Sequence, residues 1–393
     1  MKLYEELKWR GLIKDTAGQD LEDKLNNEKI SFYWGTDPTA DSLHIGHYSS
    51  LITAKRLAKR GHHPILLVGG ATGLIGDPRP TAEREIISKE TVNKNFAGLK
   101  EQVSRILEGK AEIVNNYDWM QNYNYLEFLR DIGKYINVNY MLAKDIISRR
   151  LETGITYAEF SYTLIQGYDF LHLFKDKGCI LQAAGSDQWG NITTGIELIK
   201  KIEGKEAYGF TMPLILDANG NKFGKSEGNA LWLDKTKTSS YELYQYLINS
   251  DDSKVEEYLK VFTFLSLEEI NNVMKEQNKS PESRLAQKTL AYEVVKDLHG
   301  IEEAEKAKQT SLDIFSGKIN DDMPTVMIDE KQLTLVDLLV KSNLASSKSE
   351  ARRLIIQGGI KVNNIKMINP EEVITINNTV ISKGKKNIIK VTN

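Results

Sequence analysis

"ISFYWGTDPTADSLHIGHYSSLITAKRLAKRGHHPILLVGG", residues 30–70, contains the pattern that decides the fold. Residues 30–34 form an apolar, aromatic run, and residues 64–70 form a second apolar run. Both runs are typical of buried strands. Residues 45–60 between them carry apolar side chains at helical spacing, and Gly61 ends this segment. Strand, helix and strand in this order predict a right-handed βαβ unit in a parallel sheet.

A second strand-rich part lies further along the chain. Residues 178–185 and 210–216 are apolar runs typical of buried strands, and residues 192–202 between them have helical periodicity. Residues 84–177 are predicted to be mostly helical, as an insertion that splits the sheet. The expected fold class is therefore α/β, with a Rossmann-like parallel sheet whose ligands bind at the carboxyl ends of the strands.

Three further segments are predicted after the sheet-forming part, which takes up residues 1–235. Residues 236–320 have helical spacing and few strand signals. Residues 321–330 belong to a polar, proline-containing stretch without a clear period, which is typical of a linker. Residues 331–393 show two short helices and several short strands, and they predict a small α+β domain.

The charge of the chain is unevenly distributed. The whole sequence holds 52 Lys and Arg against 54 Asp and Glu, but residues 331–393 alone carry a net charge of +7, which leaves −9 for the rest. A basic module on an acidic body favours a polyanionic partner. Solvated surface lysine is the alternative explanation.

The cysteine content and the absence of long apolar runs indicate the compartment. Cys179 is the single cysteine, which excludes an internal disulfide framework and is typical of a small buried hydrophobic residue in a reducing compartment. No apolar run has the length that a membrane span needs, and the first 15 residues alternate acidic and basic side chains, unlike a signal peptide. We therefore expect a soluble, cytoplasmic protein without a membrane partner.

Two histidines mark a candidate site at the start of the predicted helix. His44 and His47 are three residues apart, whereas helical zinc ligands usually lie four apart with a third ligand nearby, so this spacing disfavours a metal site. At a helix start, both rings would join free backbone N–H groups and the positive end of the helix dipole, which together bind phosphate. Gly46 leaves room for a ligand against the backbone. The alternative is a helix start capped by Asp41 or Ser42.

A second candidate element is the segment KFGKS at residues 222–226. It places Lys222 and Lys225 around a glycine, in a turn-rich stretch that is too hydrophilic for a strand. Several glycines in and around it suit a loop that closes on a polyphosphate and stabilises developing charge, although an exposed basic loop has the same composition. We expect both lysines to converge with His44 and His47 on one triphosphate.

Taken together, HIGH and KFGKS resemble the two nucleotide-binding motifs of class I aminoacyl-tRNA synthetases. Six further stretches are similar to bacterial tyrosyl-tRNA synthetases, in that family's order and from end to end: ELKWRGL, YWGTDPTADSLHIGH, GATGLIGDP, FSYTLIQGYDF, GSDQWGNIT and SKSEARRLIIQGG. The resemblance implies a homodimeric tyrosine–tRNA ligase that makes tyrosyl-adenylate from L-tyrosine and ATP, with Mg²⁺ accompanying ATP, and then charges tRNA(Tyr). It implies neither a structural metal nor DNA binding.

The same resemblance assigns the domains and the nucleotide site. Residues 1–235 would be catalytic, residues 236–320 would bind the anticodon stem, and residues 331–393 would form an S4-like RNA-binding domain. The side chains expected to act in catalysis are His44, His47, Lys222, Lys225, Thr39 and Ser226. Those expected to bind ATP are Gly35, Asp37, His44, His47, Gly185, Asp187, Gln188, Leu214 and Lys225. For Asp187, an Asx turn or a helix cap is the alternative role.

The resemblance also implies a tyrosine pocket, made by Tyr33, Asp77, Tyr162, Gln166, Asp169 and Gln182. Tyr33 and Asp169 would hydrogen-bond the phenol, while Asp77, Tyr162 and Gln166 would receive the ammonium group. Tyr162, Gln166 and Asp169 share one helical face in a largely apolar stretch, which indicates burial rather than a solvated face. A bound phenylalanine would leave the buried carboxylate and hydroxyl unpaired.

A third set of residues is expected to bind tRNA. Lys348, Arg352 and Arg353 fall on or beside one short helix of the basic C-terminal module. By resemblance they would contact phosphates of the long variable arm. A charged, solvated helix is the alternative.

Two positions depart from the family pattern. Trp34 stands beside Tyr33, where relatives often carry a smaller residue. The loop after GDP lacks a lysine, so that Arg79 or Arg84 would contact pyrophosphate instead.

Three other hypotheses about the function are open. A tryptophanyl-tRNA synthetase is disfavoured by Tyr33 and Asp169, because an indole offers no phenol. A non-catalytic RNA-binding relative and a smaller adenylyltransferase are the other two.

Overall fold

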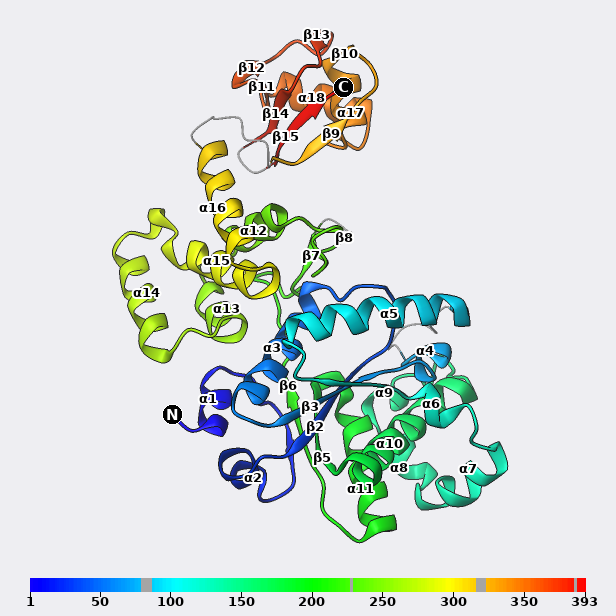
Figure 1. Cartoon of the computed structure of the whole chain (residues 1–393). Coiled ribbons are helices and arrows are strands. Elements are labelled where there is room, and N and C mark those ends of the chain that lie inside the picture. The colour runs from blue at the N-terminus through cyan, green and yellow to red at the C-terminus, as the bar shows by residue number, and fades with distance from the viewer. Residues whose placement is uncertain (79–86, 227–228, 316–322, 385–386) are drawn as a thin grey trace. The chain divides into compact units, whose positions relative to one another are not determined.

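The computed structural model describes residues 1–78, 87–226, 229–315, 323–384 and 387–393 (Figure 1). The chain forms two compact units. The first consists of Met1–Lys237 with Asp251–Ile270, and the second consists of Thr238–Ser250 with Asn271–Asn393. The chain therefore leaves the first unit after Lys237, returns to it for one short segment, and leaves again. The assignment of four functional segments stays a prediction.

A six-stranded sheet lies in the first unit. Its order is β1 (Thr16–Ala17), β6 (Tyr208–Met212), β5 (Cys179–Gly185), β2 (Ser31–Thr36), β3 (His63–Val68) and β4 (Glu112–Asn115). Neighbouring strands are parallel except β1, which is antiparallel to β6. Helix α3 (Ile45–Lys59) joins β2 to β3. The predicted βαβ unit and the α/β fold class with a Rossmann-like parallel sheet are confirmed.

Strand β4 interrupts the segment 84–177, for which the sequence predicts mostly helices. It is four residues long and partly exposed because it forms an edge of the sheet, so it lacks the long apolar run that reveals a buried strand. The helices of this segment are α5 (Lys89–Ile106), α6 (Tyr117–Met120), α7 (Tyr125–Asp131), α8 (Val138–Leu142), α9 (Asp145–Ser148) and α10 (Tyr157–Lys177). The first unit also contains α1 (Leu3–Trp9), α2 (Leu21–Asn27), α4 (Thr72–Ile75), α11 (Trp189–Glu203) and α13 (Val255–Phe262).

Helices α10 and α11 pack closely because glycine lies at their contact. A Cβ atom added to Gly167 would lie 2.9 Å from the Thr194 side chain, and one added to Gly195 would lie 2.8 Å from the Phe170 side chain. Phe170 in turn packs on Tyr33 of β2, with ring centroids 5.3 Å apart. These contacts hold α10, which carries three predicted tyrosine-binding residues, against the sheet.

The second unit begins with a group of helices. These are α12 (Ser240–Ile248), α14 (Leu267–Lys279, which starts in the first unit), α15 (Leu285–His299) and α16 (Ile301–Phe315). Helix α12 packs on both α15 and α16. The predicted helical segment is therefore present in the structure.

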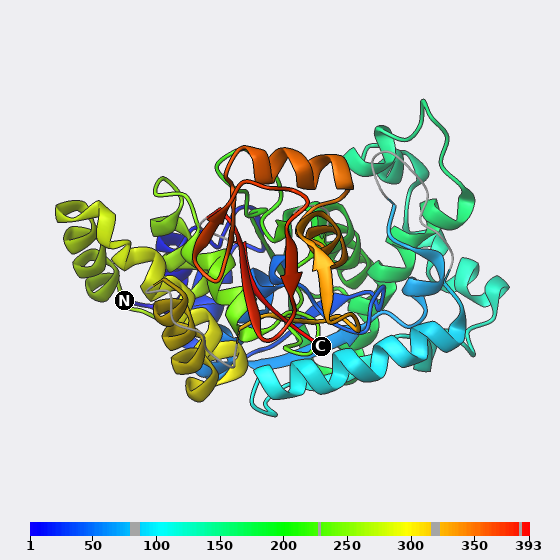
Figure 2. The ribbon, with the colours of Figure 1, turned by 90° about the horizontal axis from the view of Figure 1, so that it is seen from above.

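The C-terminal module is a small α+β fold with its own core, as predicted. Its sheet has the order β12 (Ile365–Met367), β11 (Ile360–Val362), β14 (Thr379–Lys383), β15 (Asn387–Thr392) and β9 (Thr325–Met327). Strands β10 (Gln332–Thr334) and β13 (Val373–Thr375) form a separate pair, and the helices are α17 (Leu335–Lys341) and α18 (Lys348–Ile356). Figure 2 shows the red strands of this module with orange helices beside them.

Strand β9 corrects the predicted linker 321–330, because Thr325–Met327 pair in parallel with β15. Three residues with one half-buried side chain between two exposed ones are too few to show a period in the sequence. Among the residues that the structure describes, no helix is long and apolar enough to cross a membrane.

Candidate active site

The two histidines lie side by side at the start of α3. His44 is the residue before the helix, and its Nδ1 accepts a hydrogen bond from the Gly46 backbone N–H at 3.1 Å. Nδ1 of His47 accepts from the His44 backbone N–H at 3.3 Å, and the ring centroids are 3.9 Å apart. The helix is therefore capped by His44. Asp41 pairs instead with Lys237, and the alternative of an Asp41 or Ser42 cap is wrong.

These hydrogen bonds set the tautomer of both rings in their neutral form. Because each Nδ1 accepts from a backbone N–H, the proton of each neutral imidazole is on Nε2, which makes Nε2 a hydrogen-bond donor. Burial, reinforced by the neighbouring His44, lowers the pKa of His47 to about 3. His47 is therefore a neutral donor throughout the physiological pH range.

The KFGKS segment contacts the start of α3 directly. Gly224 has φ +90°, and a Cβ atom at this position would lie 2.2 Å from Cγ2 of Ile45. The Gly224 carbonyl accepts from Leu231 N–H at 3.3 Å, and the Leu231 carbonyl accepts from Ile45 N–H at 2.8 Å. The structure thus brings the two motifs together. Lys222 is exposed on the turn that leads into Gly224.

Some predicted residues cannot be placed at the level of side chains. Lys225 and Ser226 form the short strand β7 (Lys225–Ser226), which pairs with β8 (Asn229–Ala230), but their side chains lie outside the described part of the chain. Arg79 and Arg84 lie outside the described residues altogether. Their roles stay predictions.

Two buried polar atoms lie among the residues predicted to bind tyrosine. Tyr33 on β2 and Gln182 on β5 are register partners on adjacent parallel strands, and both are almost fully buried. Within the described residues, neither the Tyr33 hydroxyl nor Gln182 Oε1 has a hydrogen-bond partner. Because an unpaired buried polar atom is costly, such atoms point to a partner that a bound ligand supplies. Burial, and then the nearby Asp169, raise the pKa of Tyr33 well above its usual value.

Asp169 lies on α10 and is held by two donors. The Asn116 amide donates to Oδ2 and the Trp119 indole N–H donates to Oδ1, both at 2.9 Å. Burial raises the pKa of Asp169 to about 7, although these two hydrogen bonds favour the ionised form. The carboxylate is fixed in position and titrates close to neutral pH.

The remaining predicted polar residues form two short networks. Asp37 accepts from the Tyr162 hydroxyl at 3.0 Å and from the Thr72 hydroxyl at 2.8 Å. Gln188 donates to Asp77 at 2.9 Å, and Asn191 donates to Gln166 and to Gln188, each at 2.9 Å. Residues expected to bind the nucleotide and residues expected to bind tyrosine are therefore hydrogen-bonded to one another, near the carboxyl ends of β2, β3 and β5.

Four residues of these networks were not predicted as site residues: Thr72, Asn116, Trp119 and Asn191. Asn116 and Trp119 follow directly after β4, the strand that the sequence does not reveal. If β4 had been recognised in the sequence, Asn116 and Trp119 would have been expected at the ligand-binding edge of the sheet. Asn191 lies inside GSDQWGNIT, where the resemblance gives it no separate role.

The other predicted nucleotide contacts are accessible to a ligand. Gly35, Thr39 and Asp187 are exposed, and Leu214 is exposed over 53% of its surface, which is unusual for a leucine. Trp34 is buried and, by strand alternation, faces the side of the sheet opposite to Tyr33. The Trp34 side chain therefore does not lie on the face of the sheet that carries the Tyr33 hydroxyl.

The C-terminal module presents the three predicted tRNA contacts. Lys348 pairs with Asp337 at 2.7 Å, Arg352 pairs with Glu371 at 3.3 Å, and Arg353 is exposed. Exposed ion pairs contribute little free energy to folding, so a phosphate can replace the carboxylate partners.

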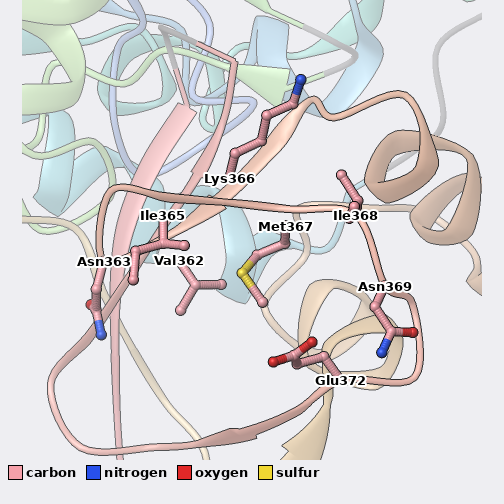
Figure 3. Close-up of a pocket in the computed structure, with 8 residues that line it drawn as sticks. All are labelled: Val362, Asn363, Ile365, Lys366, Met367, Ile368, Asn369 and Glu372. Carbon is pink, nitrogen blue, oxygen red and sulfur yellow. The ribbon is translucent and has the colours of Figure 1, made fainter.

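A separate pocket of about 330 Å³ lies by β12, where Met367 and Glu372 point toward a common hollow and Lys366 points away (Figure 3). It includes none of the three predicted residues.

Two family models match the chain: tRNA synthetases class I (W and Y) over residues 25–316, and the tyrosine–tRNA ligase SYY-like C-terminal domain over residues 315–391. Tyrosine–tRNA ligase 1 of Bacillus subtilis (strain 168) is 48% identical over 99% of both chains, and tyrosine–tRNA ligase of Geobacillus stearothermophilus is 47% identical over 98% of both. The crystal structure of a C-terminally truncated Aspergillus nidulans mitochondrial tyrosyl-tRNA synthetase is similar at a TM-score of 0.71 and 35% identity, covering 80% of this chain and 94% of that one.

A parallel sheet, a HIGH segment in contact with the KFGKS turn, and the match to the class I family model together define a class I aminoacyl-tRNA synthetase. Full-length similarity to curated enzymes narrows this class. The chain belongs to the tyrosyl-tRNA synthetase family, the class I tyrosine–tRNA ligases. The family and the enzyme class predicted from the motifs are confirmed.

Proposed function

We propose that this chain activates L-tyrosine with ATP, forming tyrosyl-adenylate and pyrophosphate, and then transfers the tyrosyl group to the 3′ end of tRNA(Tyr). The observation that carries the proposal is the buried, unpaired Tyr33 hydroxyl next to the oriented carboxylate of Asp169. A phenol between them accepts a hydrogen bond from Tyr33 and donates one to Asp169. Phenylalanine leaves the Tyr33 hydroxyl without a partner and offers no donor to Asp169, so it is rejected.

The ammonium group of tyrosine is assigned to the other end of the pocket. Asp77 supplies a negative charge, and Gln166 supplies an amide oxygen that Asn191 orients. The Tyr162 hydroxyl donates to Asp37, so its own lone pairs can accept from the ammonium. These contacts direct the substrate carboxylate toward the nucleotide.

The activation step needs positioning and charge stabilisation, without a covalent nucleophile. A carboxylate oxygen of tyrosine attacks the α-phosphorus of ATP, and the bond from that phosphorus to the bridging oxygen breaks, so that negative charge develops on pyrophosphate. His44 and His47 donate from Nε2 to this charge, and Lys222 and Lys225 neutralise it. Thr39 contacts the γ-phosphate and Ser226 assists the loop. Mg²⁺ enters with ATP as part of that substrate.

The nucleotide is held by residues beside this step. Gly35, Gly185 and Leu214 flank it, and Asp187 accepts from the ribose hydroxyls. Gln188, hydrogen-bonded to both Asp77 and Asn191, lies between the tyrosine and nucleotide residues and contacts the reacting region.

In the transfer step, a ribose hydroxyl at the end of tRNA attacks the carbonyl carbon of tyrosyl-adenylate, and AMP leaves. Lys348, Arg352 and Arg353 hold phosphates of the tRNA, and the helical segment 236–320 contacts the anticodon stem. The net charge of +7 over residues 331–393 supports this division of labour.

A homodimer in the cytoplasm is part of the proposal. Between residues 125 and 157, several large apolar side chains are exposed, among them Tyr125, Leu126 and Tyr157, and the two tyrosine hydroxyls lie 3.1 Å apart. An apolar patch of this kind fits a second copy of the chain. Leu126→Asp should therefore produce monomers in analytical ultracentrifugation. Leu267 is also exposed but lies on α14, so the control variant Leu267→Asp should leave the dimer intact.

ATP–pyrophosphate exchange tests the proposed activity. The purified chain should exchange label with tyrosine and not with phenylalanine or tryptophan, each tested alone at saturating MgATP. Exchange with tryptophan alone would contradict the phenol pocket, and folded protein without any exchange would favour the RNA-binding relative.

A further inference from the structure

Helix α13 packs on α3, and both helices belong to the first unit. The ring of Phe262 stacks on Tyr48 of α3, with centroids 5.9 Å apart and an interplanar angle of 10°. The Arg56 guanidinium, also from α3, donates to the carbonyl of Val261 at 3.0 Å and to that of Thr263. The end of α13 is thus fixed to the helix that begins at the catalytic histidines.

The same helix holds the turn that carries Lys222. The Phe223 ring lies 4.6 Å from the Tyr258 ring and 4.9 Å from the Phe262 ring, measured between centroids. The Tyr258 hydroxyl donates to the Leu216 carbonyl at 2.9 Å. Leu216 pairs with Lys222 across the turn, so Tyr258 contacts both arms of it.

We infer that Tyr258 and Phe262 are positioning residues for the catalytic turn 215–224, and that they act through Phe223. This inference rests on the proposed function. Phe223 lies between Lys222, which meets the leaving pyrophosphate, and Gly224, which rests on Ile45. Its ring is buried against α13, and its N–H donates to Ile215 at 3.0 Å.

The physical reason is preorganisation. A flexible lysine side chain stabilises developing charge only when its backbone is held at a set distance from the reacting phosphates. Because α13 contacts α3 and the turn at once, it fixes Lys222 relative to His44 and His47. Neither Tyr258 nor Phe262 belongs to the set of residues assigned to tyrosine, so their loss should act on the chemical step.

The test uses Tyr258→Leu and Tyr258→Phe in the full chain, with Val255→Ala as the control. Val255 is also buried on α13 but is one full turn away from Tyr258. In single-turnover measurements at saturating tyrosine and MgATP, Tyr258→Leu should slow tyrosyl-adenylate formation about 10- to 100-fold. The Kd for tyrosine should stay unchanged. Tyr258→Phe keeps the ring and should recover most of the rate, and Val255→Ala should match the parent chain.

A double-mutant cycle with Lys222→Ala separates positioning from general destabilisation. If Tyr258 acts through the turn, Lys222→Ala should cost much less in the Tyr258→Leu background than in the parent chain. Additive losses, an unchanged rate, or a parallel loss of tyrosine affinity would each overturn the inference. If Tyr258→Leu lacks the parent's circular dichroism spectrum, Phe262→Leu takes its place in the cycle. A parent chain that forms no adenylate would refute the proposed function itself, whereas normal variants of an active parent refute only this inference.

Discussion

Under the proposed function, Asp169 is the residue on which amino-acid recognition depends most. Its two oxygens are oriented by Asn116 and Trp119, so the carboxylate needs no rearrangement when a phenol binds. Asp169→Ala removes a hydrogen bond to a charged group and leaves both donors unpaired. We expect kcat/KM for tyrosine in ATP–pyrophosphate exchange to fall roughly 10- to 150-fold. This corresponds to a loss of about 1.5–3 kcal/mol of transition-state stabilisation. Asp176→Ala, at an exposed position of the same helix, should have no effect.

The raised pKa of Asp169 also predicts a pH dependence. Phenol binding needs the ionised carboxylate as acceptor, and the pKa of this group in the unliganded enzyme is about 7. Tyrosine affinity should therefore be full well above pH 7 and decline as the pH falls through about 7, because protons then compete with the ligand. His47, with a pKa of about 3, should not contribute to this decline. Equilibrium dialysis between pH 5.5 and 8.5 checks the trend, and a profile that is flat in the parent chain or unchanged in Asp169→Asn would contradict it.

At the scale of single residues, the sequence alone predicts some members of the proposed tyrosine site and misses others. The helical spacing of Tyr162, Gln166 and Asp169 is visible in the sequence because one element carries all three. The position of Asn116 beside Asp169 is not visible in the sequence, because it depends on the pairing of β4 with β3. Asn116 and Asp169 are 53 positions apart in the chain. Gln182 follows only from the family resemblance, and its buried, unpaired oxygen appears only in three dimensions.

At the scale of elements, the contact between the catalytic turn and α3 depends on Gly224. Its φ of +90° and its position on Ile45 exclude a side chain. Gly224→Ala should slow adenylate formation by about 100-fold, because the turn moves away from the histidines. Gly220→Ala is the matched control, since its φ is also positive, at +81°, but no atom lies within 4 Å of the added Cβ. If both variants were slowed equally, backbone strain rather than the contact with α3 would be the cause of the slower adenylate formation. If neither were slowed, the contact would not be needed.

Elements with long apolar runs could be predicted from the sequence, and short edge elements could not. Strands β2, β3 and β5 are buried on both faces, so their residues are nearly all apolar. Strands β4 and β9 have few residues and partly exposed faces, and each is held by pairing with a strand far away in sequence. Their existence depends on partners that local sequence does not reveal.

At the scale of the whole molecule, the basic C-terminal module should serve only the second step. Removing the residues after Phe315 should leave ATP–pyrophosphate exchange intact and lower tRNA aminoacylation by about 100-fold or more, because the phosphate contacts are lost. Deletion from Lys331 is the poorer experiment, because it leaves β9 without its partner β15. Equal loss in both steps would mean that the module supports the catalytic fold.

The return of Asp251–Ile270 to the first unit has a consequence for synthesis on the ribosome. An N-terminal domain usually folds as soon as its last residue has emerged, but here Ile270 is added 33 residues after Lys237. At typical elongation rates this delay is about 2 to 7 seconds. Until α13 itself emerges, the surfaces of Tyr48 and Phe223 that it will cover stay exposed to water.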